Sequence, residues 1–118
     1  MYVYLYTTKS NGSNSLLRSV EKVVPEGNIQ QFASIEELSR KLREPKEGHV
    51  IAVLMATTRE ELIELSLLGN QFRDMKRILI IPDEEDETIS LAHSMKPRFL
   101  STRTDDFSEI EAVLGRIT

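Results

Sequence analysis

The most constraining feature of the sequence is an uninterrupted run of six apolar residues, Val50–Met55. A strand with one wet face would alternate apolar and polar residues, so this run indicates a central strand of a parallel sheet covered by helices on both sides. In open sheets of this kind, sites lie beyond the carboxyl ends of the strands. The residues at that end are Met55, Ala56, Thr57 and Thr58, and none is a carboxylate, histidine or cysteine. The sequence is therefore informative about fold and reveals little about chemistry.

Four other stretches have the composition of strands, and helical apolar patterns separate them. The pattern predicts strands over residues 2–6, 28–33, 49–56, 77–81 and 99–100, with the second near an edge because Gln30 and Gln31 interrupt it. Apolar residues at helical spacing occur within 16–24, 35–42, 62–68, 89–95 and 107–117. This alternation predicts one α/β domain over residues 1–118. We expect a three-layer sandwich around a five-stranded parallel sheet in the flavodoxin-like order 2-1-3-4-5.

Helix boundaries have local signals. Ser34 with Glu37, and Thr58 with Glu61, form two capping boxes, in which the hydroxyl accepts from a backbone N–H and the glutamate reaches back. The other expected boundaries are an N-cap at Asn14 or Ser15, a helix end at Pro25 and Gly27, and a C-cap at Gly69–Asn70.

Composition excludes several classes of function. Fifteen Lys and Arg against nineteen Asp and Glu give a net charge of −4, which argues against nucleic-acid binding because that needs a basic face. The absence of cysteine excludes disulfides and thiolate metal sites. The N-terminal MYVYLYTT lacks the charged region of a signal peptide, and no apolar run reaches the ~20 residues that span a bilayer. We expect a cytoplasmic protein without a membrane segment.

The stretch from Arg77 onward, RILIIPDEEDETISLAHSMKPRFLSTRTDDFSEIEAVLGRI, resembles the last two strands and helices of a receiver domain of bacterial response regulators. The whole chain is similar to these domains in length and in its alternation of predicted strands and helices. The resemblance implies a chemical signature that this sequence lacks. The acidic pair that follows strand one of a receiver is replaced here by Tyr6-Thr7-Thr8, and the phosphoacceptor aspartate after strand three by Leu54-Met55-Ala56. The Ser or Thr that ends strand four is replaced by Ile81-Pro82. The Lys-Pro that ends strand five is replaced by Thr102-Arg103-Thr104, where Arg103 would keep the positive charge.

The resemblance therefore implies a degenerate receiver, or pseudo-receiver, that is not phosphorylated in the usual way. Without those carboxylates we expect no catalysis, no metal and no cofactor. Receivers usually signal through helix four, strand five and helix five, here residues 88–117, so we expect a protein partner or a homodimer through that face. Its candidate residues are Ile89, His93, Lys96, Phe99, Arg103, Phe107 and Glu111.

Two alternatives to this interpretation remain. The loop Lys9–Ser15 could bind an anion or nucleotide in a cleft with Thr57, Thr58 and the acidic run Asp83–Glu87, although its single glycine matches no phosphate-loop motif. The chain could also be an enzyme of another flavodoxin-like family, which is disfavoured because no base–nucleophile pair is recognisable.

Other polar residues have ordinary interpretations beside the functional ones. The acidic run could bind a metal, but carboxylates at a helix N-terminus also interact favourably with its dipole while solvated. His49 and His93 have no second ligand at metal-binding spacing. Ser10, Ser13 and Ser15 lack the G-x-S-x-G context of a hydrolase. A basic patch for an acidic partner could form from Arg77, Lys96, Arg98 and Arg103.

Overall fold

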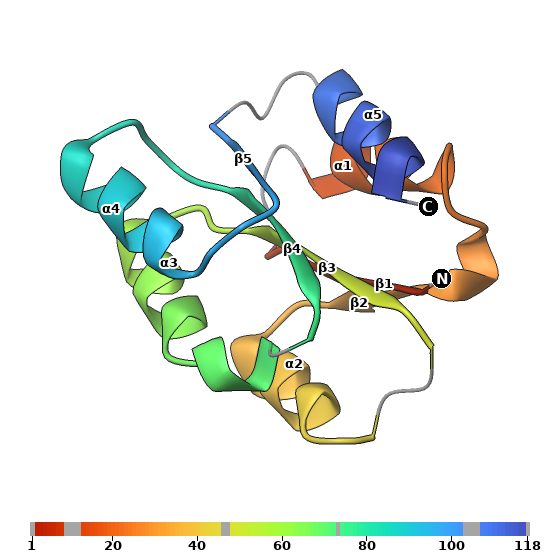
Figure 1. Ribbon diagram of the computed structural model, residues 1–118, viewed down its shortest axis with the longest axis horizontal. Helices are drawn as coiled ribbons and strands as arrows, with labels where there is room; N and C mark the ends of the chain where they lie inside the picture. The colour runs from red at the N-terminus through yellow and green to blue at the C-terminus, as the bar shows by residue number, and fades with distance from the viewer. Residues whose placement is uncertain (1, 9–12, 46–47, 73, 103–106, 118) are drawn as a thin grey trace.

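The computed structural model describes residues 2–8, 13–45, 48–72, 74–102 and 107–117. It is an α/β sandwich around a parallel sheet in the order β2-β1-β3-β4-β5 (Figure 1), so the predicted fold class and strand order are confirmed. The strands are β1 (Tyr2–Tyr6), β2 (Ile29–Phe32), β3 (Val50–Met55), β4 (Lys76–Ile80) and β5 (Phe99–Ser101). The helices are α1 (Ser13–Glu21), α2 (Ile35–Leu42), α3 (Arg59–Ser66), α4 (Asp86–Ser94) and α5 (Ser108–Ile117), with short 3-10 helices η1 (Glu26–Asn28) and η2 (Gly69–Phe72).

The central strand is the apolar run that the sequence singles out. All six residues of β3 are buried, and the strand pairs with β1 on one side and β4 on the other. Val53, for example, lies between Leu5 and Ile78 in the register. Burying a side chain of this size contributes about 1.5–3 kcal/mol relative to leaving it exposed. The two-sided burial of β3 therefore accounts for much of the core.

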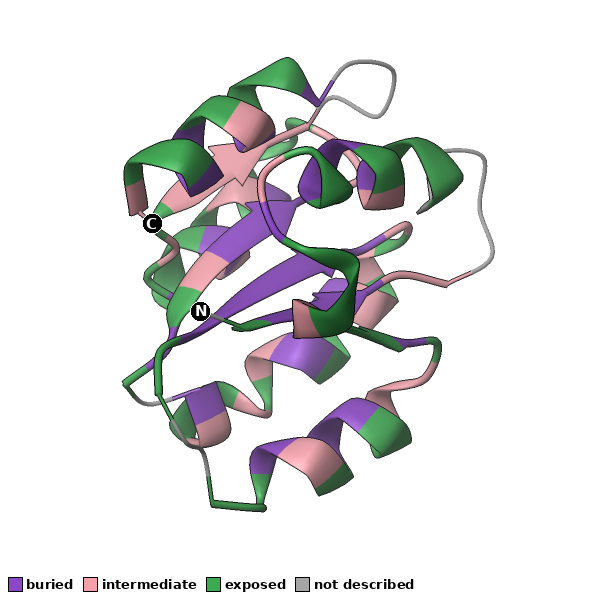
Figure 2. Cartoon of the chain, turned by 90° about the vertical axis from the view of Figure 1, so that its right-hand side faces the viewer, coloured by how far each residue is buried: buried purple, intermediate pink, exposed green. Residues whose placement is uncertain are grey.

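Alternate residues of β3 enter two separate hydrophobic clusters. Ile51, Val53 and Met55 face α1 and α5, whereas Ala52 and Leu54 face α2, α3 and α4. Figure 2 shows the buried sides of the helices turned toward the sheet on both faces. The period of two residues along a strand thus fixes which helices each side chain supports.

Three predicted helix boundaries are wrong. Helix α1 begins at Ser13, so the expected caps Asn14 and Ser15 lie inside its first turn, and it ends at Glu21 before Pro25. Helix α3 ends at Ser66 with Leu67 as its C-cap, and Gly69–Asn70 opens η2 instead. This short helix carries Phe72, which is fully buried, so core packing determines the backbone there and not the local glycine signal.

The expected apolar stripe of α3 is only partly buried. Leu62 and Leu65 are fully buried, but Ile63 is 44% exposed and Leu67 is 78% exposed. Residues 63 and 67 are four apart and therefore share a different helix face from residues 62 and 65. The sequence suggested one broad apolar face, and the structure buries only half of it.

Candidate functional site

The carboxyl ends of β1 and β3 form the edge where a receiver-like fold would have its chemistry. Strand β3 ends at Met55 and is followed by Ala56, and these residues are 2% and 3% exposed. Beyond β1 lie Thr7 and Thr8, and the Thr7 hydroxyl donates to the Thr8 carbonyl. Among the described residues, no group of three or more His, Cys, Asp or Glu side chains could hold a metal ion.

Arg59 connects the first turns of α3 and α4 across this edge. Its Nε donates to the Thr88 hydroxyl at 3.0 Å, and Thr88 is fully buried. Its Nη1 contacts the Glu87 carboxylate at 2.9 Å, and its Nη2 forms an ion pair with Glu85. One guanidinium therefore binds two carboxylates of the acidic run and a buried hydroxyl. We call this arrangement the Arg59 clip.

The rest of the acidic run is also bound locally. The Asp83 carboxylate accepts the Glu85 backbone N–H at 3.0 Å. A hydrogen bond from Thr88, that backbone bond and the nearby Arg59 together hold the pKa of Asp83 below its usual range. The Thr102 hydroxyl donates to Glu84 at 3.1 Å. The run begins α4 as predicted, and four of its five carboxylates interact with neutral or cationic groups of this chain.

A buried polar group that the sequence did not reveal lies under the same edge. The Thr57 hydroxyl donates to Glu61 Oε2 at 3.0 Å, and Glu61 Oε1 is buried without a hydrogen-bond partner among the described residues. Burial raises the pKa of the Tyr6 phenol, and the nearby carboxylates of Glu61 and Glu64 raise it further. Tyr6 therefore stays neutral here.

Glu61 shows how the capping-box interpretation was half right. The Thr58 hydroxyl does accept the Glu61 backbone N–H at 3.1 Å, and Ser34 accepts the Glu37 N–H at 3.1 Å. The Glu61 carboxylate, however, binds Thr57 and approaches Tyr6. A threonine immediately before the cap was the signal that could have suggested this second partner.

The predicted partner face surrounds strand β5, which is an edge strand between α4 and α5 (Figure 1). His93 and Lys96 are exposed there. Ile89 and Phe99 are half-buried and pack on opposite hydrophobic clusters, because α4 and α5 cover opposite faces of the sheet. Arg103 lies outside the described residues.

The last two residues predicted for this face are placed differently from the expectation. Phe107 is 3% exposed and belongs to the core beneath α5, so its side chain cannot contact a partner. The Glu111 carboxylate lies 3.7 Å from Nζ of Lys22, the residue that follows α1, and α5 packs against α1 on this side. The helical period that predicted an apolar stripe for α5 could have shown that Phe107 belongs to the core.

The remaining candidates are distributed along the chain. His49 is exposed just before β3, at the amino end of the sheet, and its carbonyl accepts the Tyr2 N–H. Of the expected basic patch, Arg77 and Lys96 line one pocket, and the Arg98 N–H donates to the Arg77 carbonyl. Of the serines, Ser15 lies in the first turn of α1. Residues 9–12 of the predicted anion loop lie outside the described residues, so that prediction stays untested.

Comparisons with known proteins identify a fold and no family. No family model matches the sequence, and no curated protein is similar to it at a significant level. Among solved structures, the chain is similar to a protein of Burkholderia pseudomallei described as pilus assembly-related, with a TM-score of 0.66 and 15% sequence identity. The match covers 98% of this chain and 88% of that one.

The chain has a receiver-like fold. At 15% identity the likeness extends to architecture alone, which the parallel five-stranded sheet in the order β2-β1-β3-β4-β5 already shows. No helix among the described residues is long and apolar enough to cross a membrane.

Proposed function

We propose that this chain is a pseudo-receiver that acts by binding a protein, and that it neither accepts a phosphoryl group nor catalyses a reaction. The observation that supports this most is the Arg59 clip. It pairs Glu85 and Glu87 with a cation of the chain itself at the edge where receiver chemistry would take place.

Phosphoryl acceptance needs a carboxylate nucleophile beside a hard cation, which takes several oxygen ligands. At the end of β3 the described residues offer Met55 and Ala56, both nearly fully buried and neither nucleophilic. Asp83 and Glu61 are the nearby acids, and each is hydrogen-bonded within its own segment. Bringing them together would require breaking those bonds.

The same clip has a consequence for the partner face. Because Arg59 joins α4 to α3, the orientation of α4 is fixed by contacts within the chain. The face around β5 is then available to a partner without a change in the position of α4. It consists of the exposed His93 and Lys96 beside the half-buried Ile89 and Phe99. A module of this kind would bind without an activating modification.

The first partner to test is a second copy of this chain. Edge strands present backbone groups that another chain can approach, and β4 is the one described strand that pairs with β5. A stable dimer buries about 800 Å² on each partner, which two helices and an edge strand can supply. The structural neighbour described as pilus assembly-related shares this fold, and a place in a protein assembly suits a module without chemistry.

Sedimentation velocity over a range of concentrations tests the proposal. His93→Glu places a charge on the exposed side of α4, and Gln30→Glu adds the same charge on β2, at the opposite edge of the sheet. We expect self-association that His93→Glu weakens at least tenfold and Gln30→Glu leaves unchanged. A monomer at every concentration would contradict the homodimer, and equal effects of the two variants would place the interface elsewhere.

A further inference from the structure

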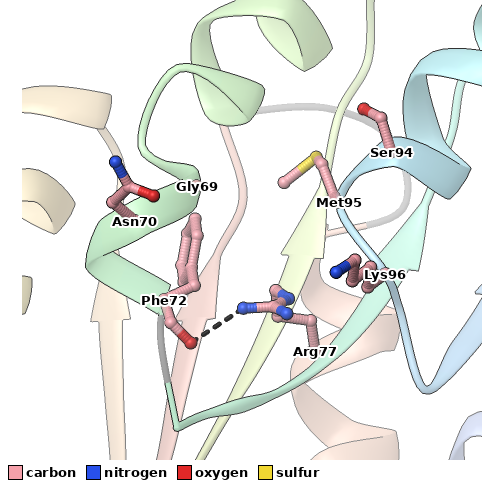
Figure 3. Close-up of a pocket in the computed structure, with 7 residues that line it drawn as sticks. All are labelled: Gly69, Asn70, Phe72, Arg77, Ser94, Met95 and Lys96. Carbon is pink, nitrogen blue, oxygen red and sulfur yellow. Dashed lines mark hydrogen bonds between the residues drawn. The ribbon is translucent and has the colours of Figure 1, made fainter.

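A pocket of about 300 Å³ lies between η2 and the carboxyl end of α4, where β4 begins (Figure 3). This is the opposite end of the sheet from the Arg59 clip. Two cationic side chains, Arg77 and Lys96, line it together with neutral residues, and the described residues of its lining include no Asp or Glu. A cationic pocket is unexpected in a chain whose net charge is −4.

Arg77 is held in place by Phe72. Its Nη1 donates to the Phe72 carbonyl at 2.7 Å, and its guanidinium carbon lies 5.9 Å from the centroid of the Phe72 ring. Phe72 is fully buried, so this anchor is rigid. The guanidinium is thereby fixed at the wall of the pocket, with one carbonyl as its bonded acceptor.

The charge of Arg77 is not neutralised within the described part of the chain. None of the ion pairs there involves Arg77, and its Nε is buried without an acceptor. Burial lowers the pKa of this guanidinium, because a less hydrated environment disfavours the charged form. A partly buried cation without a carboxylate is ordinarily compensated by an anion.

Lys96 brings a second positive charge to the same pocket. Its backbone has φ of +52°, a left-handed conformation that follows the end of α4, and its N–H bonds the His93 carbonyl at 3.0 Å. Figure 3 shows the Lys96 side chain directed toward the guanidinium of Arg77. Two cations directed toward each other repel, and an anion between them would remove that repulsion.

We propose that this pocket binds one compact oxyanion, a carboxylate or a phosphate group, with Arg77 and Lys96 as its cations. A guanidinium presents paired N–H donors that match two oxygens of such a group. The volume is at the lower limit of ordinary ligand pockets, which favours a small anion over a dinucleotide. This site requires no protein partner, so it goes beyond the proposed function.

The test is a titration of the ¹⁵N-labelled chain with sodium phosphate and, separately, sodium acetate, with sodium chloride keeping the ionic strength constant. We expect saturable shifts of the amides of 69–72 and 94–96 with at least one of the two. A response to phosphate alone, or to acetate alone, identifies which oxyanion the pocket prefers, and either supports the proposal.

Two variants make the test specific. Lys96→Asn removes the charge while keeping a residue that tolerates the left-handed backbone, and should weaken binding at least fivefold. Lys76→Gln removes the same charge from the exposed residue next to Arg77, on the other face of β4, and should change nothing. No saturable shift, or equal weakening by both variants, would overturn the proposal. The titration reports anion binding and sedimentation reports self-association, so a failure of this proposal can be told apart from a failure of the proposed function.

Discussion

Replacing Arg59 by glutamine removes the side chain that joins α3 to α4. The glutamine keeps a similar stem and loses the positive charge and the planar fork. Three contacts disappear: the bond to the buried Thr88 hydroxyl and the ion pairs with Glu85 and Glu87. The structure allows each loss to be weighed, because the partners differ widely in exposure.

The contact with Thr88 is the largest contribution. Thr88 is fully buried, and a hydrogen bond of this kind contributes about 0.5–1.5 kcal/mol. The side chains of Glu85 and Glu87 are 68% and 82% exposed, so each ion pair contributes at most about 0.5 kcal/mol after screening by solvent. We therefore expect Arg59→Gln to lower the free energy of unfolding by about 1–2 kcal/mol, or roughly 4 °C in Tm for each kcal/mol.

Urea unfolding followed by circular dichroism measures this change, with Glu87→Gln as the control. Glu87→Gln breaks only one exposed ion pair and should cost less than about 0.5 kcal/mol. At about 1 M salt the Debye length falls to roughly 3 Å, which screens the two ion pairs. The loss of unfolding free energy that remains is then that of the hydrogen bond to Thr88. The reasoning fails if Arg59→Gln costs no more than the control, or if high salt abolishes its whole effect.

For other substitutions, burial and hydrogen bonding predict losses of stability of different size, and denaturant unfolding measures each of them. Leu65→Ala removes a fully buried side chain and should lower the free energy of unfolding by about 2–5 kcal/mol. Leu67→Ala, at a position 78% exposed, should change it by no more than about 0.5 kcal/mol. Similar losses in the two variants would contradict the assigned helix face. Ser34→Ala removes the cap of α2 and should cost about 1 kcal/mol, and no loss would show that the cap is unimportant. The raised pKa of Tyr6 stabilises the fold below about pH 10, and this contribution is lost as the pH rises further, because the unfolded chain ionises first. Tyr6→Phe should therefore lose less stability than the wild type between about pH 9 and pH 11, and parallel declines would contradict the burial of the phenol.

The fold was predictable because its signals are local and redundant. The apolar run Val50–Met55 indicated a buried central strand, and Gln30 and Gln31 indicated an edge strand, as the structure has them. A period of two or of 3.6 residues is written directly in the sequence. Where a boundary was wrong, as at Gly69, burial of Phe72 outweighed the local preference.

The candidate sites were less predictable because their partners are distant in sequence. Arg59 and Thr88 are 29 residues apart, and only the packing of α3 against α4 brings them together. Arg77 and Lys96 were named as members of a basic cluster, but nothing in the sequence showed that these two would line one pocket. Glu61 had a plausible local role as a capping residue, which concealed its contact with Tyr6.

The most direct test of the pseudo-receiver proposal is intact-mass spectrometry of the chain after incubation with acetyl phosphate, with and without Mg²⁺. We expect an unchanged mass in both conditions, because no nucleophilic carboxylate lies at the end of β3, where Met55 and Ala56 are buried. A hydroxylamine-sensitive phosphate adduct on an aspartate such as Asp83, formed only with Mg²⁺, would contradict the proposal.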